Sequence, residues 1–265
     1  MQEAIKTEPP QVYHRFLDET GDTTFYGKGR KVIVGREGVS LSFGLGVISI
    51  DRPLEEVRRE IRVLQSQVEA DPLLNTIPSV QKRVKSGGFY FHACKDTPDV
   101  RSVLLRFIRE LPCEAELVVA RKIPALFEKQ HNAREDEFYA DLLAHLIKNR
   151  LKRAGTLVLN VAERGSSTRE KVLTGALALA TERAAKRWGA ENLKARTVFN
   201  VQNPRIEPLL SVSDYLCWAV QRVFELGGMR HYNYLTEKIR LVVDLYDRSK
   251  YARNRNYYDK KNPLT

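Results

Sequence analysis

Phe16-Leu17-Asp18-Glu19-Thr20-Gly21-Asp22 is the stretch of this chain on which the interpretation of its fold depends. Its apolar start runs directly into carboxylates, a threonine and a glycine, which is typical of a strand that ends in an acidic turn. The end of a strand holds a carboxylate in a fixed geometry, and Mg²⁺ is bound by oxygen ligands held in this way. The stretch therefore predicts either a metal site or an acidic turn in which Asp18 or Asp22 caps local backbone groups.

The composition indicates a globular protein with an anionic partner. The 265 residues are 43% hydrophobic and 29% charged, which is enough apolar material for a packed core. The formal net charge of +11 favours a polyanion as partner, first nucleic acid and second an acidic membrane surface. No apolar run approaches the roughly 18–20 residues that span a bilayer, and we expect no membrane segment.

The two ends of the chain and its cysteines complete this general description. The polar N-terminus has no apolar signal core, and Cys94, Cys113 and Cys217 have no paired spacing. These features predict a cytoplasmic protein with reduced thiols. We expect a flexible tail over 1–11, one domain over 12–247 and a basic, tyrosine-containing tail over 248–265. The last tail is expected either to contact phosphates and bases or to be a solvated segment whose tyrosines pack on the domain.

The hydrophobic pattern predicts an α/β protein. Short strand-like runs separated by glycines, 12–18, 31–34 and 39–50, predict an antiparallel meander of three strands. After them, strands and helices alternate, which predicts parallel strands joined by crossover helices. The helices are expected over 54–69, from 97–98 onward, and over 136–152, 169–188, 209–226 and 232–247. Strands are expected over 89–93, 116–120, 156–162 and 197–201, and a loop over 71–88.

Two further acids occur in positions comparable to that of Asp18. Asp214 interrupts an apolar helix and shares one face with Leu210, Cys217 and Trp218, so it either serves a site or benefits from a nearby helix N-terminus. Glu163 directly follows a buried-looking strand and is either a metal-facing carboxylate or a partner for Arg164. Acids clustered from such elements would hold the one or two Mg²⁺ ions that phosphodiester hydrolysis uses.

Three motifs together resemble the domain of unknown function 3800 family. They are the run 16–22, the tripeptide Phe91-His92-Ala93, and the helix that contains Ser213-Asp214-Tyr215. Members of that family open with a D-E-S-G-D strand end, carry an F-H-A element and close with a Q-x-A-D-Y helix. Here Thr20 replaces the serine, Ser211 the glutamine and Ser213 the alanine. The resemblance implies an RNase H-like fold, with a mixed sheet flanked by helices.

The resemblance also implies roles for individual residues. Asp18 and Asp214 match the acids expected to bind metal, and Glu163 resembles an acid at the end of a later strand in the wider superfamily. A strand aspartate would fall more naturally at Asn160, so the third ligand stays open. Glu19 is part of the matched motif, but it faces the same site only if the strand has already bent, because neighbouring residues point to opposite faces.

His92 belongs to the second motif. It either orients a phosphate and moves a proton near neutral pH, or forms a structural hydrogen bond at the end of a strand.

These observations predict a nuclease that hydrolyses RNA or DNA with Mg²⁺ or Mn²⁺. The expected catalytic residues are Asp18, Glu19, His92, Glu163 and Asp214, of which Asp18, Glu163 and Asp214 hold the metal. Arg121, Lys122 and Arg164 are expected to line the approach of the nucleic acid. The alternative is a nucleic-acid-binding module on the same fold that no longer holds metal productively, which Asn160 favours.

Overall fold

The structure, a computed structural model, describes residues 11–152, 154–162, 168–247 and 256–265. Its centre is a mixed sheet of seven strands in the order β5-β4-β1-β2-β3-β6-β7. The strands are β1 (Val12–Gly21), β2 (Ser42–Ile50), β3 (Cys113–Arg121), β4 (Gly155–Ala162), β5 (Ala195–Gln202), β6 (Ile239–Asp244) and β7 (Tyr257–Tyr258). β2 lies between β1 and β3 and runs antiparallel to both, whereas β4 runs parallel to β1 and to β5. The expected α/β class with a mixed sheet is confirmed.

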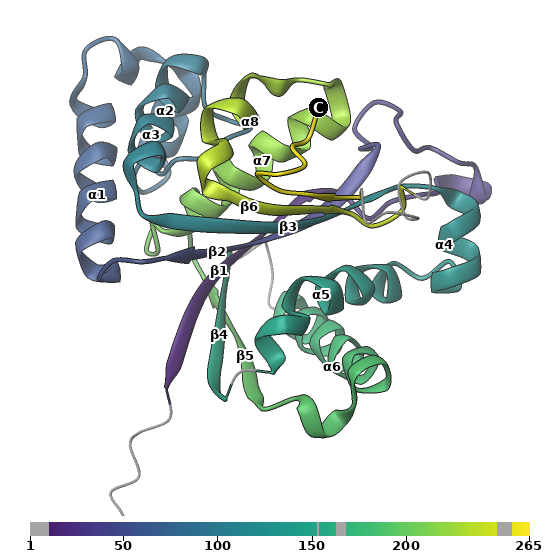
Figure 1. The fold of residues 1–265 in the computed structure, drawn as a ribbon. Coiled ribbons are helices and arrows are strands. Elements are labelled where there is room, and N and C mark those ends of the chain that lie inside the picture. The colour runs from purple at the N-terminus through teal and green to yellow at the C-terminus, as the bar shows by residue number, and fades with distance from the viewer. Residues whose placement is uncertain (1–10, 153, 163–167, 248–255) are drawn as a thin grey trace, which may run out of the picture.

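Helices cover both faces of this sheet (Figure 1). They are α1 (Leu54–Ala70), α2 (Pro78–Lys85), α3 (Pro98–Glu110), α4 (Pro124–His131), α5 (Glu135–Leu151), α6 (Thr168–Trp188), α7 (Leu210–Leu226) and α8 (Met229–Leu235). One hydrophobic core lies between the sheet and the group α1, α2, α3, α7 and α8, and a second lies between the sheet and α5 with α6. None of the helices in the described parts of the chain is long and apolar enough to cross a membrane.

The alternation of β1 assigns its side chains to these two layers. Phe16 is fully buried in the core on the α7 side, and Leu17 is fully buried in the core on the α5 side. Neighbouring residues of a strand point to opposite faces, so Asp18 follows Phe16 to the α7 side and Glu19 follows Leu17. The ladder between β1 and β2 continues through both residues, with Asp18 opposite Gly46 and Glu19 opposite Leu45.

Glycine 46 lets α7 lie directly on the middle of the sheet. A Cβ atom on Gly46 would collide with the Sγ atom of Cys217, which occupies the space above the strand. The same Sγ atom lies 3.9 Å from the carbonyl oxygen of Asp18. Because Gly46 has no side chain, α7 can pack closely against the sheet beside Asp18.

Both ends of α7 are tied to other elements by carboxylates. Before the helix begins, the nearly fully buried Glu207 accepts hydrogen bonds of 2.6–3.1 Å from Arg58 of α1. Near its C-terminal end, Glu225 accepts hydrogen bonds of 2.8 Å from the main-chain N–H groups of Leu41 and Ser42. These contacts fix the position of α7 along the sheet.

Several predicted elements differ from the observed ones. The third strand of the antiparallel set is β3, not 31–34, which contributes only an isolated bridge between Tyr26 and Val32. The run 89–93 is not a strand, and the loop expected over 71–88 contains α2. The helix expected over 232–247 is wrong in its second half, because that half forms β6 and adds to the edge of β3. Its apolar residues suit either a helix or a strand, and the free edge of β3 selects the strand.

The described part of the C-terminal segment packs on the domain. Tyr257 and Tyr258 form β7, which pairs with β6 in an antiparallel manner, and Tyr258 is only 4% exposed. Asn256 adds a reciprocal pair of hydrogen bonds with the backbone of Asp244. At least these tyrosines therefore belong to the folded body. The expected N-terminal tail lies almost wholly outside the described residues.

Candidate functional site

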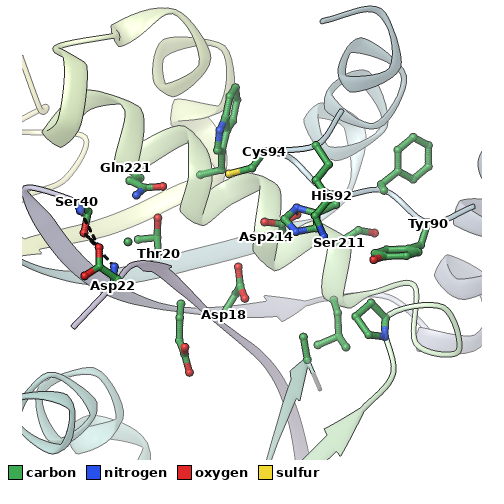
Figure 2. A pocket seen from close by; sticks show the side chains of 18 of the residues that line it. Asp18, Thr20, Asp22, Ser40, Tyr90, His92, Cys94, Ser211, Asp214 and Gln221 are labelled. Carbon is green, nitrogen blue, oxygen red and sulfur yellow. Dashed lines mark hydrogen bonds and ion pairs between the residues drawn. The ribbon is translucent and has the colours of Figure 1, made fainter. Parts of the chain in front are cut away.

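A cavity of about 660 Å³ opens where the end of β1 meets α7. Figure 2 shows the side chains around it, and Asp18 and Asp214 point into the same space. The other walls come from the segment 90–95, from Ser40 near the start of β2, and from the end of β4 at Ala162. Strand ends, a helix and a turn that lie far apart in the sequence thus meet around one hollow.

Asp214 is oriented by the turn that follows Phe91. Its Oδ2 atom accepts a 2.7 Å hydrogen bond from the main-chain N–H of Ala93 and lies 3.4 Å from Nδ1 of His92. That Nδ1 atom is buried and has no hydrogen-bond partner among the described residues. His92 therefore presents a ring nitrogen beside the carboxylate, in a position suited to hold a proton next to Asp214.

The turn itself is held by a buried acid, Asp96. Its Oδ2 atom accepts a 2.8 Å hydrogen bond from the His92 N–H and a 2.5 Å hydrogen bond from the Tyr215 hydroxyl, while Arg83 pairs with Oδ1 at 2.5 Å. Burial raises the pKa of Asp96 although Arg83 opposes this change. Arg101 binds the carbonyl oxygen of Ala93 with two N–H groups at 2.8 and 3.0 Å. The position of His92 is thus fixed by contacts on both sides.

Glu19 touches the cavity but is turned toward the other layer. Its Oε1 atom accepts a 2.9 Å hydrogen bond from the hydroxyl of Tyr139 on α5. The strand stays regular at this point, so the condition under which Glu19 would share the face of Asp18 is not met. Glu19 therefore lines the cavity while its carboxylate is bound to α5 on the other side of the sheet.

Asp22 has a structural role at the rim. It accepts hydrogen bonds of 2.7 Å from the N–H and hydroxyl of Ser40, and Lys122 pairs with it at 3.0 Å. Burial disfavours the charged form of Asp22, but these bonds together outweigh that effect and lower its pKa. The acidic turn expected for this stretch is formed at Asp22, whereas Asp18 points into the cavity.

Two of the three cations expected to line the approach, Lys122 and Arg121, are placed elsewhere. The side chain of Lys122 is fully buried and also donates to the Thr24 carbonyl at 2.9 Å, and burial lowers its pKa. Arg121 pairs with Asp244 at 2.8 Å on β6. Neither side chain lines the cavity. Lys95, which was not singled out from the sequence, is exposed and lines the cavity.

The third acid is not fixed by the described residues. Glu163 and Arg164 lie outside them, although Ala162, the last residue of β4, lines the cavity. Asn160 is buried within the sheet, donates a 3.1 Å hydrogen bond to the Arg15 carbonyl and accepts one of 2.9 Å from Asn200. It is therefore engaged by its neighbouring strands.

The negative charge of Asp18 and Asp214 affects the pKa of two neighbouring thiols, Cys217 and Cys94. Burial raises the pKa of Cys217 far above its usual value, and Asp18 and Asp214 raise it further. Burial and then Asp214 also raise the pKa of the more exposed Cys94, and Asp18 adds to this. Both carboxylates act on both thiols, as expected if the two acids lie close together.

The carboxylates of Asp18 and Asp214 suit a Mg²⁺ ion that keeps several of its water ligands. Among the described residues, no group of three or more histidine, cysteine, aspartate or glutamate side chains is arranged to enclose a metal. Mg²⁺ is usually bound by one or two carboxylates, with water and substrate phosphate completing six ligands. Asp18 and Asp214 fit this pattern, with the cavity providing room for the remaining ligands.

Comparison with known proteins gives no further guide. No protein-family model and no curated protein matches the chain.

Proposed function

We propose that this protein is a nuclease that hydrolyses phosphodiester bonds of RNA or DNA with Mg²⁺ or Mn²⁺ held by Asp18 and Asp214. The observation that carries the proposal is that these two acids, one from β1 and one from α7, line a single cavity. Such a metal would polarise the scissile phosphate and activate water. An RNase H-like fold is part of the proposal, supported by the antiparallel set β1, β2 and β3 and by β4 parallel to β1.

The residues of the chain have separable tasks in this proposal. Asp18 and Asp214 supply oxygen ligands, and the Ala93 N–H fixes the orientation of the Asp214 carboxylate. His92 holds or accepts a proton at Nδ1 beside that carboxylate. Lys95 lines the cavity and contributes positive charge for an incoming phosphate. The net charge of +11 supports a polyanionic substrate more strongly than a small phosphate ester.

The second candidate is a nucleic-acid-binding module without catalysis. The amide at Asn160 and the lack of a three-residue metal group in the described part of the chain favour it. The two candidates agree on the partner and differ on hydrolysis, so a cleavage assay separates them.

The test is incubation of the purified protein with labelled RNA, single-stranded DNA, duplex DNA and RNA–DNA hybrid, with Mg²⁺, Mn²⁺ or EDTA. If the proposal is right, at least one substrate is cleaved. EDTA should abolish this cleavage, and so should each of the substitutions Asp18→Asn and Asp214→Asn on its own. Asp51→Asn is the matched control, because Asp51 is exposed and follows the C-terminal end of β2, whereas the cavity lies near the start of that strand. Binding without cleavage under every condition would favour the second candidate.

A further inference from the structure

Arginine side chains and a histidine gather around Trp218 at one edge of the cavity. The guanidinium carbon of Arg101 lies 4.3 Å from the centre of the Trp218 ring, and that of Arg222 lies 5.7 Å from it. The ring of His231 lies 4.6 Å from the same indole. Arg230 precedes His231 on α8 and is exposed. We call Arg101, Arg222 and Arg230 the cation cluster, and His231 lies among them.

The cation cluster has no acidic counterpart in the described parts of the chain. Arg101 donates to the carbonyl oxygens of Ala93 and Asp96 and, like Arg222 and Arg230, pairs with no described carboxylate. Burial lowers the pKa of His231, and the charges of Arg101, Arg230 and Arg222 lower it further. The three arginines therefore all lie close enough to His231 to disfavour its charged form.

Other partly buried arginines of the protein are neutralised by acids. Arg58 binds Glu207, Arg83 pairs with Asp96, and Arg150 pairs with Glu116. Like charges held together raise the free energy of the folded state unless an anion or solvent compensates them. The cation cluster thus differs from the usual arrangement in this chain, and its composition matches that of an anion site.

The position of the cluster relative to the acids is set by one helix. Asp214, Trp218 and Arg222 are spaced four residues apart, so they follow one stripe along α7. At 1.5 Å per residue, Arg222 stands about 12 Å along the helix axis from Asp214. Asp214 and Trp218 both line the cavity. A strand with a rise of about 3.4 Å per nucleotide would cover this distance in three to four steps.

We propose that the cation cluster binds backbone phosphates of the nucleic acid strand whose scissile phosphate lies at Asp18 and Asp214. The inference rests on the proposed function, since it takes nucleic acid as the substrate, and it adds the direction in which the strand leaves the acids. Arginine guanidinium groups donate to phosphate oxygens in pairs, and the apolar face of Trp218 keeps Arg101 and Arg222 extended beside it.

The experiment measures binding in the absence of hydrolysis. The parent is Asp18→Asn in EDTA, and the probe is a labelled single-stranded oligonucleotide of about ten residues. Arg222→Gln and Arg230→Gln are combined in this parent. The matched control combines Arg59→Gln and Arg106→Gln, which remove the same charge from exposed positions on α1 and α3.

The cluster variant is expected to bind at least about tenfold more weakly than the control variant. It should also reduce the slope of log K against log salt by about 1.4, or 0.7 for each lost contact on a single strand. Equal losses in both variants would overturn the inference and leave the nuclease proposal intact. A parent that binds no oligonucleotide at all would overturn both.

A second readout uses the parent itself and does not depend on how the variants fold. A bound phosphate near His231 should raise the pKa of its imidazole, measured by NMR titration with and without oligonucleotide, because the anion stabilises the charged ring. His231→Gln assigns the resonance. An imidazole pKa that is unchanged in the saturated complex would place the strand elsewhere and overturn the inference.

Discussion

The main-chain N–H of Ala93 donates a 2.7 Å hydrogen bond to the Oδ2 atom of Asp214. This bond joins the turn after α2 to α7, and it places His92 beside the carboxylate that faces Asp18. The turn, α7 and the part of β1 that carries Asp18 therefore form one structural unit. The Asp214 carboxylate accepts the hydrogen bond from Ala93 and also faces the cavity. A variant must therefore distinguish its structural role from its proposed role as a metal ligand.

Asp214→Asn is expected to keep the fold and to abolish hydrolysis. The asparagine side-chain oxygen can still accept the bond from Ala93, whereas the neutral amide binds a divalent cation poorly. Loss of a metal ligand removes several kcal/mol of transition-state stabilisation, so the cleavage rate should fall at least about 100-fold. Cleavage kinetics and thermal unfolding of the same samples check this, and Asp51→Asn should change neither. A variant that cleaves at the wild-type rate would contradict the assignment of Asp214.

Cys94 provides a probe of the two carboxylates that needs no activity. Burial and the neighbouring Asp214 raise the pKa of this thiol, so alkylation by iodoacetamide should be slow near neutral pH and should accelerate as pH rises. Asp214→Asn lowers the pKa and should increase the rate at a fixed pH. Cys113, with a pKa raised to about 12, and Cys217 are buried and should stay unmodified in the folded protein.

The same thiol should respond to metal. Mg²⁺ held by Asp18 and Asp214 would offset their negative charge, lower the pKa of Cys94 and increase its alkylation rate at a fixed pH. Protein carrying Asp18→Asn together with Asp214→Asn serves as control and should show no such effect. A wild-type rate that does not change up to saturating Mg²⁺ would count against metal binding at these residues.

Gly46→Ala tests the close approach of α7 to the sheet. The added methyl group would collide with Cys217 Sγ, and overpacking of this kind costs about 1–3 kcal/mol in the free energy of unfolding. Cys217→Ala in the same chain should restore part of the loss, which a double-mutant cycle in urea measures. Gly175→Ala in α6 is the control. That site has open space, so alanine should be neutral or stabilise the helix by up to about 1 kcal/mol. Simple additivity of the two changes would show that these residues do not meet.

The Asp22–Lys122 pair predicts a pH dependence of stability. The pKa of Asp22 is lowered in the folded state, so its contribution is present above the ordinary value of 3.8 and is lost as pH falls through the folded pKa. Asp22→Asn should reduce the free energy of unfolding at pH 7 by about 1–3 kcal/mol, because it leaves the Lys122 ammonium buried without an opposite charge. The difference between wild type and variant should shrink below about pH 4.

Asp136→Asn is the matched control for that measurement. Asp136 also has a lowered pKa, from its hydrogen bond with Arg134, but that pair is exposed and screened by solvent, so its loss should change the stability much less than the loss of Asp22. Urea unfolding of the three proteins from pH 3 to 8 gives the comparison. Equal effects of the two substitutions would mean that the burial of Lys122 adds nothing to the pair.

The sequence predicted best several long elements that can be recognised from their own residues, without knowledge of the partner against which they pack. The helices α1, α5 and α6 and the strands β4 and β5 lie within a few residues of the expected ranges. The segment 232–247 differs, since its second half pairs with β3 across a long sequence separation. The partner of a strand is set by packing that no short window of sequence contains.

The sequence by itself determined that an acid follows the apolar start of β1 and that another interrupts the apolar helix α7, although the strand continues past Asp18 to Gly21 and does not end there as expected. Local alternation and helical spacing were sufficient for that, and they also placed Leu210, Asp214 and Trp218 on one face, where all three line the cavity. Only the tertiary structure decided that the two acids meet, that Glu19 turns toward Tyr139 and that Lys122 is buried against Asp22. The physical reason is non-local: α7 reaches Asp18 because Gly46, on a neighbouring strand, leaves room for Cys217.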